Sequence, residues 1–202
     1  PGLVTRSRDR VGPGGELEIG VLALQGAFSE HLHCLSALQV PSREVRRPQE
    51  LEGLDGLILP GGESTAIGKL MAAGGLVAPL RRFADGHAVW GTCAGMILLA
   101  KDIGPDPPLL GLMEMVVERN AFGRQIDSFE EPLTVEELEE GAERPFPGIF
   151  IRAPRLAAVK APARIIARLP DGTAVAARQG RLLATAFHPE LSRDLRFHRY
   201  FL

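Results

Sequence analysis

The chain has 202 residues, which is enough for one α/β domain to bury a large core without a disulfide or metal crosslink. Its formal net charge of −2 excludes the basic surface that nucleic acids or anionic membranes require. No apolar stretch approaches the roughly 20 residues that span a bilayer. The two cysteines cannot form a disulfide framework, which suits a reducing compartment. We therefore expect a cytoplasmic protein with no nucleic-acid or membrane partner.

The first 17 residues, Pro1 to Leu17, are polar and rich in Gly, Pro and Arg. They lack the apolar stretch of a signal peptide. Because the sequence starts at Pro1 without a Met, we expect a truncated or engineered start and a disordered segment over 1–17. Beyond it we find no internal repeat and no clear linker, which predicts a single domain over 18–202.

The first half of the domain alternates between apolar runs of strand length and helical patterns. The continuous apolar run at 19–24 is typical of a parallel strand that is buried on both faces. Further strands are predicted at 42–47, 56–59 and 87–90, and helices at 27–39, around 67–71, at 76–83 and at 96–100. This alternation predicts an α/β fold with a mostly parallel central sheet and helices on both faces.

The second half predicts consecutive strands and a final helix at 191–202. The expected strands are 112–118, 148–152, 163–169, 173–178 and 181–187. Gln179-Gly180 lies between the last two strands and predicts a tight hairpin turn. The C-terminal portion is therefore expected to be antiparallel. The acidic stretch 136–143 is predicted to be a solvated helix or loop.

The pentapeptide Gly91-Thr92-Cys93-Ala94-Gly95 has the spacing of a nucleophile elbow, with Cys in place of Ser. In such an elbow a strand turns sharply into a helix and leaves the nucleophile on strained backbone. The two glycines let neighbouring segments approach without a Cβ clash. The helix start favours a thiolate and directs N–H groups at an oxyanion. The alternative is a small buried core residue, which is how we interpret Cys34.

A thiol nucleophile needs a base, and the base needs a group that orients it. His188-Pro189-Glu190 supplies both, directly after an apolar strand. In extended backbone, residues i and i+2 project to the same side. Glu190 can therefore accept a hydrogen bond from one imidazole nitrogen of His188 while the other nitrogen faces the thiol. The remaining histidines lack such support and are interpreted as structural or solvated: His31, His33, His87 and His198.

Pro60-Gly61-Gly62-Glu63-Ser64 forms a second loop at a predicted strand end. Ligands of open α/β sheets bind just beyond the carboxyl ends of the strands. The two glycines can offer N–H groups to an oxyanion or to a substrate carboxylate. The loop lacks the Lys-Ser/Thr of a phosphate-binding P-loop, which argues against nucleotide binding. The alternative is a plain turn in which Ser64 or Glu63 caps the following helix.

The elbow at Cys93 together with His188-Pro189-Glu190 resembles the class I glutamine amidotransferases, the triad glutaminase family. From about residue 19 to residue 202, the chain is similar to the glutaminase subunits of pyridoxal 5′-phosphate synthase. The motifs that carry this closer resemblance are Ala23-Leu24-Gln25-Gly26, Leu59-Pro60-Gly61-Gly62-Glu63-Ser64-Thr65, Arg119-Asn120-Ala121-Phe122-Gly123-Arg124-Gln125 and Phe150-Ile151-Arg152-Ala153-Pro154.

The resemblance implies a flavodoxin-like α/β fold and hydrolysis of L-glutamine to L-glutamate and ammonia. The ammonia would pass, within a hetero-oligomeric complex, to a synthase subunit that builds pyridoxal 5′-phosphate. No metal or organic cofactor is implied. Cys93 is expected to be the nucleophile, His188 the base and Glu190 its orienting group. Substrate contacts are expected from Gly62, Glu63, Ser64, Arg119, Ile151 and Arg152, the oxyanion hole from amides of Gly61, Gly62 and Ala94, and coupling to the partner from Gln25.

Two other interpretations remain open from the residues alone. The same triad could serve a different amidotransferase system, such as one of histidine, tryptophan or purine synthesis, although the stretch 119–125 argues against this through resemblance. A noncatalytic cysteine sensor, chaperone or regulatory subunit is the second. A sensor needs no pair like His188 and Glu190, and a regulatory subunit is favoured when the triad is broken, whereas here all three members are present.

Overall fold

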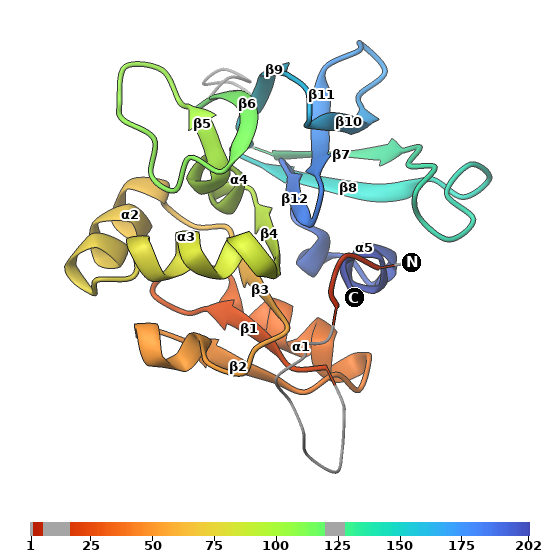
Figure 1. Cartoon of the computed structure of the whole chain (residues 1–202). Helices are drawn as coiled ribbons and strands as arrows, with labels where there is room; N and C mark the ends of the chain where they lie inside the picture. Colours follow the sequence, from red (N-terminus) through yellow and green to blue (C-terminus); the bar gives the residue numbers. More distant parts are fainter. Residues whose placement is uncertain (1, 6–16, 120–127) are drawn as a thin grey trace.

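The computed structural model describes residues 2–5, 17–119 and 128–202 (Figure 1). Within these ranges, none of the helices has the length and apolar character needed to cross a membrane. In chain order the elements are β1 (Ile19–Leu22), α1 (Phe28–Ala37), β2 (Ser42–Val45), the 3-10 turn η1 (Pro48–Leu51), β3 (Gly56–Leu59), α2 (Ser64–Ala73), α3 (Val77–Gly86), β4 (Ala88–Thr92), α4 (Ala94–Leu99), β5 (Ala100–Asp102), β6 (Met113–Glu118), β7 (Ser128–Leu133), β8 (Phe146–Ile151), β9 (Arg155–Val159), β10 (Arg164–Arg168), β11 (Ala174–Gln179), β12 (Leu182–Thr185), the 3-10 turn η2 (Pro189–Leu191) and α5 (Arg196–Phe201).

The main sheet has the strand order β2-β1-β3-β4-β12-β11-β9-β6-β5, and β10 pairs with β11 beside this path. The strands from β2 to β12 in this order all run parallel to their neighbours. From β12 onward the pairs are antiparallel, apart from β5 and β6, and β7 and β8 form a separate antiparallel pair. The predicted mostly parallel sheet with an antiparallel C-terminal portion is therefore confirmed.

The predicted hairpin at Gln179-Gly180 is also present, since β11 and β12 pair antiparallel across it. Three strands were not anticipated, namely β5, β7 and β9. The predicted helix at 191–202 is wrong in its extent, because α5 begins only at Arg196. Asp194 accepts hydrogen bonds from the Arg196 backbone N–H and guanidinium, so the segment before α5 is a turn that starts this short helix. Residues 136–143 form turns.

Of the segment 1–17, the structure describes residues 2–5 and Leu17. Leu3 and Val4 are buried, and the backbone N–H groups of both donate to the Phe201 carbonyl at 3.0 Å. These two residues thus pack against the end of α5, where Figure 1 places the two chain ends close together. The domain boundary near residue 18 stays a prediction.

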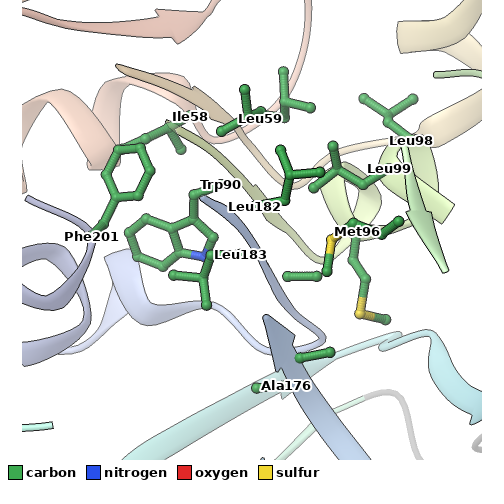
Figure 2. Close-up of a cluster of buried hydrophobic side chains, with 14 of the residues drawn as sticks. Ile58, Leu59, Trp90, Met96, Leu98, Leu99, Ala176, Leu182, Leu183 and Phe201 are labelled. Carbon is green, nitrogen blue, oxygen red and sulfur yellow. The ribbon is translucent and has the colours of Figure 1, made fainter. Parts of the chain in front are cut away.

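Helices pack on both faces of the parallel half of the sheet. Trp90 of β4 packs against His31 of α1 and Phe201 of α5, with ring centroids 5.6 Å apart in each case. Gly91, the next residue, lies against Gly95 of α4. Because successive strand residues face opposite sides, α1 and α5 cover one face and α4 the other. Figure 2 shows Trp90 and Phe201 side by side within the apolar core.

This core contains two buried histidines beside Trp90. His31 Nδ1 lies 3.0 Å from His198 Nε2, and both rings are fully buried. Burial disfavours the imidazolium form, and it lowers the pKa of His198 to about 4. Burial, and then the nearby His198 and His188, hold the pKa of His31 well below 6.5. Both rings are therefore neutral in the folded protein at pH 7.

We expect Gly95→Ala to destabilise the fold by about 1–3 kcal/mol, the usual effect of overpacking a core. A Cβ at this position would lie 2.0 Å from the Leu59 carbonyl oxygen, which is held within β3 and cannot turn away. Gly86→Ala in α3 is the matched control, because no described atom comes within 4 Å of a Cβ there. Urea unfolding of both variants measures the difference. Equal stabilities would contradict this account of the packing.

Stability is also expected to fall as the pH drops from 6.5 towards 4. In that window the unfolded chain binds a proton at His198 that the folded chain does not, so unfolding is favoured; above pH 6.5 neither state binds it. By pH 5, His198 is expected to lower the free energy of unfolding by about 2 kcal/mol. Urea unfolding at pH 7 and pH 5 should show a smaller difference for His198→Gln than for the parent. A variant of the exposed His33, His33→Gln, should behave as the parent; identical pH dependence in all three proteins would refute the assignment.

Candidate active site

The carboxyl ends of β1, β3, β4 and β12 lie side by side in the parallel half of the sheet. Each of these strands is followed by one of the motifs singled out in the sequence: Gln25-Gly26, Gly61-Gly62-Glu63, Cys93 and His188. Ligands of open α/β sheets bind at this edge. The fold therefore brings together segments that are up to about 160 residues apart in sequence.

Cys93 has the backbone geometry of a nucleophile elbow. It lies between β4 and α4 with φ 51° and ψ −104°, a conformation that is strained for any residue with a side chain. Its N–H donates to the Thr185 carbonyl at 2.8 Å, so the neighbouring strand β12 holds the turn in place. The flanking glycines are required sterically, because a Cβ on Gly91 would lie 2.3 Å from the Gly95 carbonyl oxygen.

His188 and Glu190 form a short, buried hydrogen bond next to the thiol. His188 Nδ1 donates to Glu190 Oε1 at 2.6 Å. This leaves Nε2 of the same ring for Cys93, whose interaction with the imidazole raises the pKa of His188. The backbone N–H of His188 donates to the Ile149 carbonyl at 2.8 Å, which fixes the ring's segment to β8. The three residues thus have the order of nucleophile, base and orienting group.

The electrostatic surroundings favour a proton on His188. Burial alone lowers the pKa of its imidazole, since it penalises the charged form. The hydrogen bonds with Cys93 and Glu190, together with the negative charge of Glu190, outweigh burial and raise the pKa to about 10. The ring therefore holds a proton that it can donate to a leaving group at neutral pH.

The loop after β3 approaches the triad closely. A Cβ on Gly61 would lie 2.5 Å from His188 Cε1 and 3.3 Å from Cys93 Cβ, so only glycine fits between them. The segment after β1 clamps this loop: the Ala27 N–H donates to the Gly61 carbonyl at 2.9 Å. A Cβ on Gly62 would lie 2.4 Å from Gln25 Oε1. The Gly61-Gly62 turn thus lies between Gln25 on one side and His188 and Cys93 on the other.

Glu63 caps helix α2, as the alternative interpretation of this loop expected. Its carboxylate accepts from the N–H groups of Thr65 at 3.2 Å and Ala66 at 2.6 Å. The hydrogen bond from Ala66 is the main cause that lowers the pKa of this carboxyl. The Glu63 N–H in turn donates to Gln25 Oε1 at 2.8 Å. Ser64 is the buried first residue of α2, and substrate contacts of both residues stay predictions.

Arg119 lies beside the same loop, at the end of β6. Its Nη1 donates to Thr65 Oγ1 at 3.2 Å and lies 3.6 Å from Asp106 Oδ2. Its Nε is buried and, among the described residues, has no hydrogen-bond partner. A buried guanidinium donor without a partner is costly, which suits a site that a ligand carboxylate would complete. The rest of the motif, residues 120–125, lies outside the described residues.

Ile151 contacts the thiol, Arg152 follows Ile151 in the chain, and Ala94 follows Cys93. The Ile151 carbonyl lies 3.9 Å from Cys93 Sγ. Arg152 has φ 44°, a left-handed conformation that costs free energy for a residue with a side chain. Ala94 directly follows Cys93 as the first residue of α4. The structure thus gathers all the predicted site residues at one edge of the sheet, while their roles towards substrate stay predictions.

Sequence reasoning missed the position of His31. Its Nε2 lies 3.5 Å from Glu190 Oε2 and 3.2 Å from Thr92 Oγ1. His33, two residues further along α1, is exposed. No local pattern distinguishes the two, because only the packing of α1 against η2 decides which face reaches Glu190. Cys34 lies near the same segment, and burial and then the Glu190 charge raise its thiol pKa to about 11, which makes it a poor nucleophile.

Comparison with known proteins agrees with this geometry. The pyridoxal 5′-phosphate synthase subunit PdxT of Moorella thermoacetica is 56% identical over 188 residues, covering 92% of this chain and 98% of that protein. The crystal structure of a glutamine amidotransferase matches with a TM-score of 0.85 at 50% identity, covering 91% of this chain and 96% of that chain. PurLQS from Thermotoga maritima shares the fold alone, with a TM-score of 0.71 at 15% identity over 92% of this chain and 97% of that chain.

The sequence model of the SNO glutamine amidotransferase family matches residues 21–202, which is nearly the whole predicted domain. The match includes the elbow at Cys93, the segment His188-Pro189-Glu190 and the loop that contains Gly61 and Gly62. On this coverage, together with the 56% identity to a curated relative, the chain belongs to the SNO glutamine amidotransferase family.

Proposed function

We propose that the chain hydrolyses L-glutamine to L-glutamate and ammonia with the triad Cys93, His188 and Glu190, and that the ammonia passes to a synthase partner that makes pyridoxal 5′-phosphate. Family membership supports the glutaminase chemistry. The relative from Moorella thermoacetica, a pyridoxal 5′-phosphate synthase subunit, supports the choice of partner. The observation that carries the proposal is the 2.6 Å hydrogen bond from His188 to Glu190 beside a cysteine on a strained elbow.

In the first step, the sulfur of Cys93, whose proton is held on His188 Nε2, attacks the side-chain amide carbon of glutamine, and the carbonyl electron pair moves onto oxygen. The C–N bond then breaks as the proton on His188 Nε2 moves to the leaving nitrogen, which departs as ammonia. Glu190 keeps the ring in the required tautomer through its bond to Nδ1. The product of this step is a glutamyl thioester on Cys93.

In the second step, His188 takes a proton from a water molecule, whose oxygen attacks the thioester carbonyl. The C–S bond breaks and glutamate leaves, while the proton taken from water stays on His188 Nε2, so the sulfur and the protonated ring return to their starting state. The net reaction consumes one glutamine and one water and yields one glutamate and one ammonia. The same imidazole serves as acid and then as base, so the triad needs no further titrating group.

The oxyanion of both steps would be held by backbone N–H groups of the Gly61-Gly62 turn and of Ala94. The short distance between Gly61 and the triad supports this placement. Arg119 would bind the α-carboxylate of glutamine, since its buried Nε has no hydrogen-bond partner among the described residues. Further substrate contacts would come from Gly62, Glu63, Ser64, Ile151 and Arg152.

The partner would dock on the surface next to the triad, where two large apolar side chains are exposed. Ile151 and Leu191 are exposed by 39% and 44%, which is high for large apolar side chains. Both adjoin the catalytic residues, because the Ile151 carbonyl contacts the thiol and Leu191 follows Glu190. A synthase surface that covers them would also meet Gln25, which contacts the Gly61-Gly62 turn. Docking and oxyanion-hole geometry would thereby be coupled.

Cys93→Ala should abolish glutamate release from glutamine, because the mutant has no nucleophile to form the thioester. Release by the parent chain, measured alone and with a pyridoxal 5′-phosphate synthase subunit, should rise sharply when the partner is added. Release that is independent of this synthase but absent in Cys93→Ala would keep the triad and discard the partner. Absence of release from folded parent protein with the partner bound would refute the enzymatic proposal in favour of a regulatory role.

Arg119→Gln should raise the KM for glutamine by about 10- to 100-fold, with a smaller change in kcat, because a charged hydrogen bond to a carboxylate contributes about 1.5–3 kcal/mol. Steady-state glutamate release at varied glutamine concentration gives both constants. Arg82→Gln is the matched control, since Arg82 is exposed on α3. A KM for Arg119→Gln equal to that of the control would remove Arg119 from the substrate site.

A further inference from the structure

The triad uses only one of the two carboxylate oxygens of Glu190. Oε1 accepts from His188, while Oε2 is buried and has no hydrogen bond of ordinary geometry from any described residue. The imidazole Nε2 of His31 lies 3.5 Å from this second oxygen, and both side chains are fully buried. A buried carboxylate oxygen is costly unless a donor faces it, so the N–H nearest to Oε2 helps to hold the Glu190 side chain in place.

His31 contacts the nucleophile's strand as well. Its Nε2 lies 3.2 Å from Thr92 Oγ1, and Thr92 immediately precedes Cys93. One N–H at this position can be shared between the hydroxyl and the carboxylate as a three-centre hydrogen bond. The distance to Oε2 is long, as catalytic contacts often are before substrate binds. His31 thus joins the residue that orients the base to the strand that presents the thiol.

The second ring nitrogen indicates which tautomer His31 adopts. His31 Nδ1 lies 3.0 Å from His198 Nε2, and both rings are neutral at pH 7, so each carries one N–H. If His198 Nε2 donates, His31 carries its proton on Nε2, facing Glu190. His198 Nδ1 is then a bare acceptor, and this nitrogen is the one without a partner among the described residues. A buried orphaned acceptor is tolerated better than a buried orphaned N–H.

We propose that His31 is a positioning residue of the glutaminase, whose Nε2–H, oriented by His198, holds the Glu190 carboxylate turned towards His188. The inference rests on the proposed function and adds a residue to its machinery. The titratable groups that face His31 are Glu190 and His188 near η2 and His198 on α5. Cys34, on the same helix, donates to the Glu190 carbonyl at 3.8 Å. His31 acts through Glu190 and does not contact the substrate.

A pair of variants separates the effect of the hydrogen-bond donor of His31 from the effect of the volume of its side chain. His31→Gln keeps an amide N–H at about the reach of Nε2, whereas His31→Phe keeps a ring but has no donor. Both are assayed for glutamate release with the synthase partner, and urea unfolding gives the folded fraction to which rates are normalised. Cys93→Ala is the blank.

For His31→Phe we expect kcat to fall about tenfold and the acid limb of the kcat/KM profile to move up by about one pH unit, because a Glu190 that is held less firmly stabilises the protonated ring of His188 less well. The KM should stay within about twofold, since substrate binding is unaffected. His31→Gln should keep kcat within about threefold of the parent. A purely structural role would lower the stability of both variants and leave the pH profile of the folded enzyme unchanged.

Alkylation of Cys93 by iodoacetamide, followed by mass spectrometry as a function of pH, gives a readout that needs no turnover. The pH at which half of Cys93 is alkylated should rise in His31→Phe and should not rise in His31→Gln. Parent protein that alkylates with this pattern but releases no glutamate would overturn the proposed function and leave the positioning role intact. The role of His31 would be overturned if kcat fell equally in both variants. It would also be overturned if His31→Phe had the kcat and the pH profile of the parent.

Discussion

The close backbone packing around Cys93 is the constraint on which the site depends. A non-glycine residue at φ 51° and ψ −104° costs on the order of 1–3 kcal/mol and persists only where its surroundings over-determine it. The surroundings here are the hydrogen bond from Cys93 to Thr185 and the contact of Gly95 with the Leu59 carbonyl. The apolar core beneath β3, β4 and β12 supplies the free energy that maintains this strain, and the thiol is thereby fixed at the sheet edge.

The same core determines the electrostatics of the triad. His188 and Glu190 are buried, so their mutual hydrogen bond is strong and their separation from any partner would be costly. The neutral ring of His31 faces Oε2 of Glu190, the carboxylate oxygen that does not bond to His188, and His198 faces His31. Polar groups thus extend from the thiol into the hydrophobic interior in a continuous row. From His188 to His198 each member lies within 3.5 Å of the next, and burial keeps the rings of His31 and His198 neutral at pH 7.

Local sequence patterns predicted most of what is local in this fold. The elbow glycines, the His188-Pro189-Glu190 segment and the parallel strands that precede them are each encoded within a few residues. The predicted helix at 191–202 was too long because side-chain bonds of Asp194 and Arg196, which no periodicity reveals, set where α5 begins. The position of His31 could not be predicted, since the rotation of α1 against η2 depends on packing between segments far apart in sequence. Function was more predictable than packing because the chemistry requires rigid, short motifs.

The exposed apolar side chains near the site give a bound partner a physical role: it would cover them and exclude water. Hydrolysis of a thioester needs one water, whereas ammonia must not escape to bulk water before it is used. Ile151, whose carbonyl contacts the thiol, and Leu191, which follows Glu190 in the chain, both keep much of their apolar surface exposed. A synthase surface that buries these side chains would exclude bulk water and strengthen every hydrogen bond to the oxyanion, because the local dielectric falls. Since Gln25 contacts the Gly61-Gly62 turn, the same docking event would act on the oxyanion hole, so glutamine hydrolysis would accelerate only when an acceptor for ammonia is in place.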